Sequence, residues 1–421
     1  MNESSQIVAP TLALFLYDLR EELGQDRSQI ERNRHRFWRK IEPQLDRPEA
    51  ELSEEDRQWL VQLETIEKPE AREIELLTRI RDTPLESLRD RRFPPSFYAL
   101  QMGDTYALRV ESSDPGERGM QSLEILSQLK RKVAFHVNHQ LDSAELQEGK
   151  QGTIGQTWLL WGRLPGNHLS AQQIAKACCE QLLPNEMGNA EDFQTGKLVG
   201  ASVYEWWQPP TEWHNLGREN WHQLAILFSP RQSVEGMRAT MKMLYPHLMR
   251  LFCDRNKILR AYARSRQIKA RLQADYGAIE TMSRDLQTAL QQPEISTPDW
   301  QNRLASMLEL CSRYARLSGD LDHQERTIQT SLLNYRSALG KITDLDADCQ
   351  LEFFAEFGNS IAENYRLQIE MEIAYFKSGL TVLEAITQSM QSAIALQRDV
   401  PAIAPTISPL WRRFKFRKTN S

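Results

Sequence analysis

The sequence predicts an α+β protein, in which a small antiparallel-rich sheet (a ferredoxin-like plait or a related sandwich) is followed by a long α-helical bundle or antiparallel coiled coil. Between residues 96 and 232, apolar residues recur with the two-residue period of strands, with helical stretches in between. From residue 233 almost to the end, the period becomes 3.5 or 3.6, which is typical of long packed helices. We therefore divide the chain into an N-terminal helical region with an acidic stretch (1–95), an α+β domain (96–232), a long-helix bundle (233–400) and a tail (401–421).

The N-terminal region is expected to be helical. Leu12, Phe15 or Leu16, Leu19 and Leu23 are three or four positions apart and predict a helix over 8–41, with Asp26 to Ser28 as a cap for its second piece. Residues 42–75 follow with 12 acidic against 4 basic side chains. A further helix is expected over 70–92, which Pro94-Pro95 ends.

The α+β domain opens with a hairpin signature. Apolar residues alternate over 98–102 and again over 106–110, on either side of Gly103-Asp104. We then expect a helix over 119–146, a central strand over 157–163, a helix capped by Ser170 that ends at Leu183, and strands over 198–207 and 222–229. One sheet of four or five strands with helices on one face would bury these apolar positions.

Four helices are expected after residue 233. The first covers 233–291 with a kink at Pro246, and the second covers 299–317. Gly319-Asp320 restarts the chain, and an a/d seam from Leu321 to Ile342 marks the third helix. The fourth carries apolar residues from Ile361 to Ile394. Short connections favour antiparallel neighbours in a bundle, and the seam favours a homo-oligomer.

Composition excludes several classes of function. The net charge of −5 gives no global case for nucleic acid. No apolar run reaches the ~20 residues that span a bilayer, and no basic segment precedes an apolar one at the N-terminus. Five cysteines without a C-x-x-C indicate a reducing cytoplasm rather than disulfides or zinc. Motifs of nucleotide, serine-hydrolase and zinc-protease sites are lacking, so no cofactor, metal or catalytic residue is predicted.

A cluster of tryptophans is the most informative local signal. Trp206, Trp207, Trp213 and Trp221 lie within 16 residues, and strand alternation lets only one of the adjacent pair face inward. The other must be covered by a helix, a loop or a partner, and we expect the cluster to bind a protein partner. Another hypothesis is an enzyme whose site is assembled from scattered residues beside the tryptophans: Glu205, His214 and His222.

Two basic segments stand out from the near-neutral average. Residues 250–271 carry eight basic side chains against Asp254 alone, which indicates a solvated face, docking to the acidic stretch 42–75 or, least favoured, nucleic acid. The tail combines five basic and three aromatic residues: Trp411, Arg412, Arg413, Phe414, Lys415, Phe416, Arg417 and Lys418. This combination suits an anionic membrane surface or an acidic protein groove, and a merely solubilising tail is the alternative.

The last helical pair resembles a segment of uncharacterised bacterial proteins that accompany STAND-type NTPases and caspase-like proteases in defence or signalling systems. The resemblance rests on Asn334–Leu339, Phe353–Phe357, Tyr365–Glu370, Ala374–Phe376 and Gly379-Leu380. It carries no catalytic motif and implies an adaptor or sensor role. The overall plan is also similar to the cytoplasmic part of CorA-type magnesium channels, but the chain lacks that family's membrane helices and Gly-Met-Asn motif, so channel activity is not implied.

We therefore expect a cytoplasmic, non-enzymatic interaction or adaptor protein, in which an α+β recognition domain is coupled to an oligomerising helical bundle. The alternative is a peripheral membrane protein anchored by the basic-aromatic tail.

Overall fold

The computed structural model describes residues 6–22, 24–41, 53–54, 57–58, 73–77, 97–113, 119–137, 152–166, 170–182, 193–216, 220–290 and 297–399. Contacts divide the chain into two compact units. Unit 1 comprises Met1–Gln267 and His323–Ile369, and unit 2 comprises Ile268–Asp322 and Glu370–Ser421. Three long helices therefore contribute residues to both units.

Unit 1 is built on a mixed sheet, larger than the four or five strands expected. Its order is β2-β3-β4-β1-β6-β9-β8-β7, with β5 paired to β1 beside this path, and among the described strands only β6 and β9 run parallel to each other. The strands are β1 (Gln6–Leu19), β2 (Ile74–Glu75), β3 (Phe97–Met102), β4 (Thr105–Ser113), β5 (Met120–Ser122), β6 (Gly155–Arg163), β7 (Gln194–Leu198), β8 (Ala201–Gln208) and β9 (Trp221–Phe228). The expected α+β class with a helical C-terminal part is confirmed.

The helix expected over 8–41 is wrong in its first half, which is the central strand β1. Residues 7–19 of this strand are buried on both faces, so apolar residues occupy nearly every position and include a helical spacing by coincidence. A register shift between Val8 and Thr11 accompanies Ala9, whose φ is +48°. The second half is helix α1 (Arg27–Ile41). Asp26 caps it as expected, because its carboxylate accepts the Gln29 N–H at 2.8 Å.

Several other expectations in the sheet region are confirmed. β3 and β4 form the hairpin, and Gly103 supplies its turn with a φ of +58°. Ser170 caps helix α7 (Ala171–Leu182) in a capping box, since it exchanges hydrogen bonds with Gln173. The helix expected from Gly119 instead begins with β5 and continues as α5 (Ile125–Val137), and residues 138–146 lie outside the described residues.

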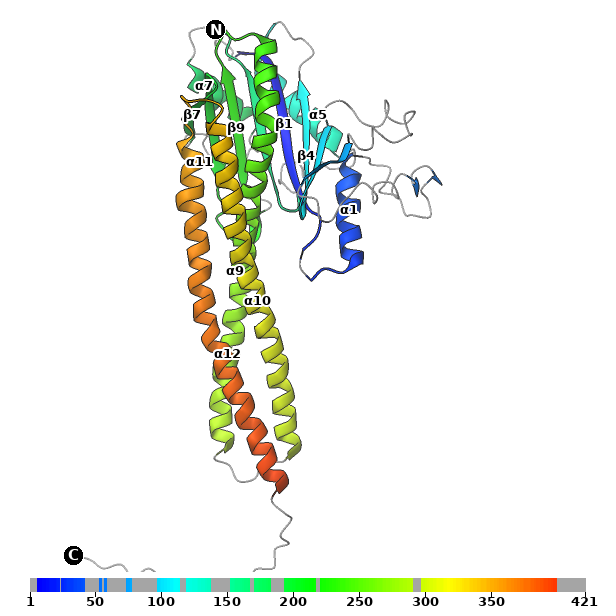
Figure 1. Ribbon diagram of the computed structural model, residues 1–421, viewed down its shortest axis with the longest axis vertical. Helices are drawn as coiled ribbons and strands as arrows, with labels where there is room; N and C mark the ends of the chain where they lie inside the picture. Colours follow the sequence, from blue (N-terminus) through cyan, green and yellow to red (C-terminus); the bar gives the residue numbers. More distant parts are fainter. Residues whose placement is uncertain are drawn as a thin grey trace, which may run out of the picture. The chain divides into compact units, whose positions relative to one another are not determined.

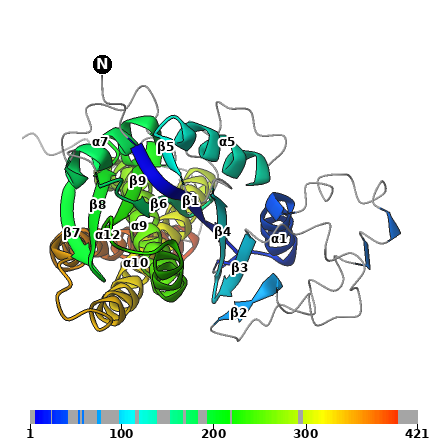
Figure 2. The ribbon, with the colours of Figure 1, turned by 90° about the horizontal axis from the view of Figure 1, so that it is seen from above.

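Helices cover both faces of the sheet, whereas one face was expected. Leu12, Leu14 and Leu16 of β1 share a core with α1, α5 and α7. The alternate positions face α9 (Val234–Leu290): Phe15 contacts Phe252 with ring centroids 5.4 Å apart, and the Tyr17 hydroxyl donates to the Met249 carbonyl. Figure 2 shows α5 and α7 on one side of the strands and α9 on the other. The sheet is therefore the middle of three layers.

The helical part consists of three long helices rather than four. α10 (Thr297–Thr343) continues through Gly319-Asp320, where a break was expected, and α11 (Glu352–Glu356) leads through a π-helical turn (Phe357–Ile361) into α12 (Ala362–Asp399) (Figure 1). A helical glycine costs about 1 kcal/mol, and burial of the neighbouring Leu317 and Leu321 offsets this cost. Pro246 lies inside α9.

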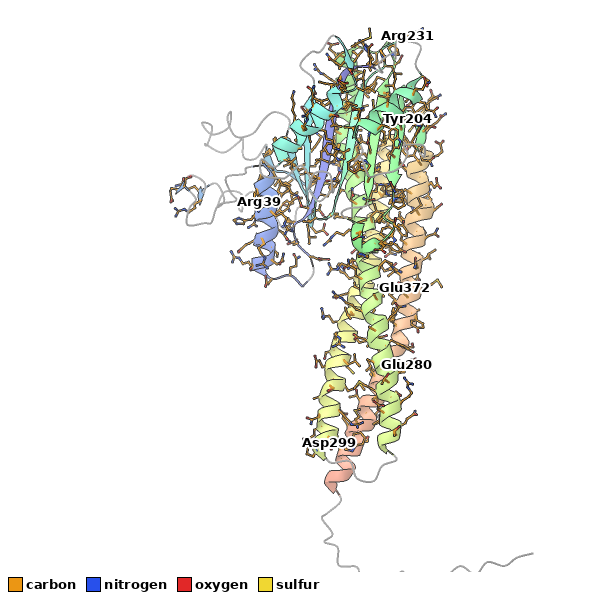
Figure 3. The ribbon with its side chains drawn as sticks, turned by 180° about the vertical axis from the view of Figure 1, so that it is seen from behind. Arg39, Tyr204, Arg231, Glu280, Asp299 and Glu372 are labelled. Carbon is orange, nitrogen blue, oxygen red and sulfur yellow. The ribbon has the colours of Figure 1, made fainter. Side chains whose placement is uncertain are left out.

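Unit 2 contains the segments of these helices that lie outside unit 1, and polar contacts join them. Lys269 of α9 pairs with Glu372 of α12 at 2.8 Å, and Arg313 of α10 pairs with Asp275 of α9 at the same distance. Glu372 is labelled in Figure 3. The Tyr314 hydroxyl donates to the Phe376 carbonyl, which joins α10 to α12. Among the described residues, no helix has both the length and the apolar character needed to cross a bilayer.

Candidate functional site

Two of the four tryptophans lie in the core of unit 1. Trp206 and Trp221 are 5% and 3% exposed and belong to the cluster that α5 and α7 cover. Trp221 stacks on Trp158 of the neighbouring strand, with ring centroids 6.5 Å apart. Neither indole is accessible to the protein partner that the sequence suggested, because the face of the sheet they share is already covered by helices.

The other two tryptophans meet the long helices. Trp207 contacts Phe357 of the π-helical turn edge to face at 5.4 Å, and its indole N–H donates to Asn220. Trp213, in a short 3-10 turn (Trp213–Asn215), contacts Tyr262 at 4.6 Å. The tryptophan that strand alternation turns outward is therefore covered by helices of its own chain. Asn220, which accepts the hydrogen bond from the Trp207 indole, belongs to the 208–221 connection, so this loop also contacts Trp207.

A buried polar chain crosses the same part of the sheet. The Thr157 hydroxyl and His222 Nδ1 are 2.9 Å apart, and His222 Nε2 donates to Glu205 at 2.9 Å. Arg255 of α9 lies 3.5 Å from the same carboxylate, and its guanidinium lies 4.3 and 4.0 Å from the ring centroids of Trp207 and Phe357. These buried polar side chains thus link three strands to α9 and to the turn that precedes α12.

Burial and the charge of Arg255 determine the charge states of His222 and Glu205. Burial lowers the pKa of His222 to about 4, helped by the positive charge of Arg255, so the imidazole is neutral. Burial acts to raise the pKa of Glu205, but the charge of Arg255 and the hydrogen bond from His222 outweigh it, and the pKa is lowered. Because the neutral His222 imidazole carries its proton on Nε2 and donates it to Glu205, its Nδ1 accepts a hydrogen bond from the Thr157 hydroxyl.

The scattered enzyme site expected from Glu205, His214 and His222 is brought together only in part. Glu205 and His222 are bonded to each other, but they are 5% and 2% exposed, so a substrate has no access to them in this conformation. His214 is 62% exposed at its side chain and pairs with Glu212. The geometry gives the buried pair a role in holding sheet and helices together.

The basic face of α9 is largely engaged by carboxylates of unit 1. Arg250 forms two hydrogen bonds of 2.9 Å with Glu73, which belongs to the acidic stretch 42–75, and this confirms docking within the chain for that residue. Lys257 pairs with Asp104 at 2.5 Å. The remaining cations of this face that meet carboxylates of unit 1 include Arg260 and Arg264, which share Glu22.

Glu22 and Asp104 were not expected from the sequence. Each lies at a turn, before α1 and between β3 and β4, where an acidic residue has an ordinary local role in capping or turn formation. Their position opposite the basic face of α9 depends on the strand order, which the local pattern does not contain. The sequence signal that could have pointed to them was the unusual density of positive charge on one helix.

Two cavities lie along this charged seam and share Asp104 and Lys257. The first, of about 420 Å³, also has Glu22, Arg260 and His323 in its wall. The second, of about 410 Å³, has Glu73 and Arg250. Within the part of the chain that the structure describes, no group of three or more His, Cys, Asp or Glu side chains is placed to hold a metal ion.

Unit 2 carries a different kind of surface. α12 exposes one seam of six uncharged residues at alternating spacings of four and three: Met371, Tyr375, Ser378, Val382, Ala385 and Ser389. Met371, Tyr375 and Val382 are 74%, 57% and 37% exposed. A hollow of about 430 Å³ between α9 and α12 adjoins Val382, and Glu280, labelled in Figure 3, lies in its wall.

The basic-aromatic tail, Trp411 to Lys418, lies outside the described residues. Comparison with known proteins finds no matching family model, no matching curated protein and no matching solved structure.

Proposed function

We propose that this chain is a non-enzymatic interaction protein of the adaptor type. Unit 1 would recognise a partner, and unit 2 would self-associate through the exposed seam of α12. In line with the resemblance noted for the helical segments, the adaptor would act in a bacterial signalling or defence system. The observation that carries the proposal is the uncharged seam, because the exposed face of a helix ordinarily carries charged side chains.

The seam has the properties of a helix–helix contact. It extends over ~27 Å at 1.5 Å per residue. The hydroxyls of Ser378 and Ser389 donate to the carbonyls of Tyr375 and Ala385, so burial of the seam would leave neither serine without a partner. Two helices could therefore meet here without desolvating a charge.

Side-chain size favours a second copy in antiparallel orientation. With a two-fold axis halfway between Ser378 and Val382, Met371 of one copy faces Ser389 of the other, and Tyr375 faces Ala385. Each large side chain then meets a small one, whereas a parallel pair would place large on large and small on small. A two-fold contact uses the same patch on both subunits, and this patch is complementary to itself.

The test is the molar mass of the full chain by light scattering over a range of concentrations. We expect a dimer that dissociates on dilution. Tyr375→Glu places a charge within the seam and should give a monomer with unchanged circular dichroism. A monomer at every concentration of the unmodified chain would overturn the proposal.

A matched control addresses exposed apolar residues in general. Met120 of β5 is 59% exposed and lies in unit 1. Met371→Glu should shift the equilibrium toward monomer, and Met120→Glu should leave it unchanged. Equal effects of the two variants would mean that the association does not use α12.

A further inference from the structure

We propose that Tyr375 of one copy of the chain inserts into the hollow between α9 and α12 of a second copy. The hollow has a volume of about 430 Å³ and lies within unit 2, and six residues line it: Tyr276, Ile279, Glu280, Ser283, Arg284 and Val382. This inference rests on the self-association proposed above. It adds α9 to the contact surface and names the side chain that anchors the contact.

α9 and α12 lie side by side in unit 2 with a constant offset in residue number. Lys269 pairs with Glu372, 103 positions later, and a Cβ on Gly379 would lie 3.1 Å from the ring of Tyr276, with the same separation in the chain. The two helices therefore run in the same direction, and each residue of α9 lies level with the residue of α12 that is 103 positions later. By this offset, the hollow lies level with residues 379–387 of α12.

The antiparallel pairing brings Tyr375 of the second copy to the same level, because Tyr375 then faces Ala385. On its own chain, Tyr375 contacts Tyr276 at one end of the hollow, with ring centroids 5.6 Å apart, so it points to the α9 side of the seam. A two-fold antiparallel pair places the same sides of both seams together. Tyr375 of the second copy is therefore directed toward the other end of the hollow, at Ser283 and Arg284.

The wall of the hollow suits an aromatic side chain that ends in a hydroxyl. Ile279, which is 1% exposed, and Val382 supply apolar surface. Among the residues that the structure describes, Glu280 and Arg284 form no ion pair, and the side chain of Arg284 makes only two hydrogen bonds of 3.4 Å within its own helix. Its guanidinium can lie over the negative face of the Tyr375 ring, and the Glu280 carboxylate can accept the phenol hydroxyl. The charges of the wall are thus complementary to this occupant.

The area of the contact also favours the participation of α9. The seam is ~27 Å long and a helix is about 10 Å wide, which gives α12 a footprint of about 270 Å². A specific interface buries about 800 Å² on each partner. An aromatic anchor in a hollow beside the seam extends the contact to a second helix, and such anchors carry much of the binding energy of an interface.

Cross-linking from the position of Tyr375 tests the contact. The full chain is made with p-benzoylphenylalanine in place of Tyr375, which keeps an aromatic side chain, and is mixed with an isotope-labelled unmodified copy before irradiation. Only links between copies join an unlabelled peptide to a labelled one, so mass spectrometry separates them from links within one chain. We expect links between copies to residues 279–284.

Light scattering on the same sample distinguishes failure of this inference from failure of self-association. A dimer in which links between copies are absent, or fall only outside 279–284, would overturn the insertion of Tyr375 and leave self-association standing. A monomer at every concentration would overturn both.

Filling the hollow gives a second measurement. Ser283→Trp should raise the dissociation constant of the dimer by about tenfold, because the new ring occupies the space that Tyr375 would enter. Ala274→Trp is the matched control, since Ala274 is an exposed residue of the same helix that does not line the hollow. Circular dichroism checks that both variants keep their helices. An unchanged dissociation constant in Ser283→Trp, or equal changes in the two variants, would overturn the inference.

Discussion

Two hydrogen bonds of 2.9 Å join the guanidinium of Arg250 to the carboxylate of Glu73, a residue 177 positions earlier in the chain. The pair fixes the acidic stretch at one point on the basic face of α9. Both side chains are about one-third exposed, so water and salt screen the attraction.

Removing this pair should have a small, salt-dependent effect. We expect Glu73→Gln to lower the free energy of unfolding by about 0.5–1 kcal/mol at low salt, because the ion pair is bidentate but partly exposed. The loss should shrink in 0.5 M sodium chloride. Urea unfolding at the two salt concentrations measures it, with Glu31→Gln in the exposed Arg27–Glu31 pair as the control. A loss that does not change with salt would contradict the electrostatic origin.

Breaking the Arg255–Glu205 pair should have a large effect on the free energy of unfolding, because both side chains are buried. Arg255→Met leaves the Glu205 carboxylate without its cation and should cost about 3–5 kcal/mol. Adding Glu205→Gln removes the unpaired charge, so the double variant should be more stable than Arg255→Met alone. Chemical unfolding of the two single variants and the double variant gives the coupling energy. Strict additivity would show that the two groups do not interact.

His222 predicts a loss of stability in weak acid. Its pKa is about 4 in the folded state and about 6.5 when unfolded, so the unfolded state binds more protons between these values. The free energy of unfolding should therefore fall as the pH drops from 6.5 to 4. Its value at pH 7.5, 5.5 and 4.5 measures the slope. His222→Gln should flatten it, and exposed His214→Gln should not; equal slopes in both variants would refute the assignment.

Structural features that depend on neighbouring residues in the chain could be predicted from the sequence, whereas features that depend on burial in the sheet or on strand order could not. The Ser170 cap and the Gly103 turn follow from local chemistry, and both are present. The central strand β1 was taken for a helix because complete burial removes the alternation that identifies a strand. The carboxylates opposite α9 come from turns whose positions depend on strand order, so the cavity around Arg260 could not be predicted.

Two glycines of the long helices should respond oppositely to alanine. A Cβ at Gly379 would lie 2.7 Å from Cζ of Tyr314 and closer still to its hydroxyl, so Gly379→Ala should cost about 1–3 kcal/mol. A Cβ at Gly319 meets nothing within 4 Å, and Gly319→Ala should gain about 0.5–1 kcal/mol in helix stability. Thermal unfolding of the two variants compares them. A loss in Gly319→Ala would contradict an uninterrupted α10.

The tail remains a prediction that vesicles can test. Each basic residue near an anionic surface contributes about 1 kcal/mol, and the aromatics favour the headgroup boundary. We expect the full chain to co-sediment with phosphatidylserine vesicles and a chain ending at residue 409 to stay in the supernatant. Vesicles of phosphatidylcholine serve as the control. Equal binding of both chains would exclude the tail as an anchor.

The division of the long helices between the units has a consequence for how the protein can change in length. Residues 268–322 are an excursion from unit 1, to which the chain returns at His323, and α12 leaves unit 1 after Ile369. Seven residues added to or removed from α9, α10 and α12 together would preserve the packing seam. Unit 2 can therefore be lengthened or shortened by whole heptads in all three helices without altering a residue of the sheet. A heptad added to one helix alone would shift the residues that it packs against the other two helices.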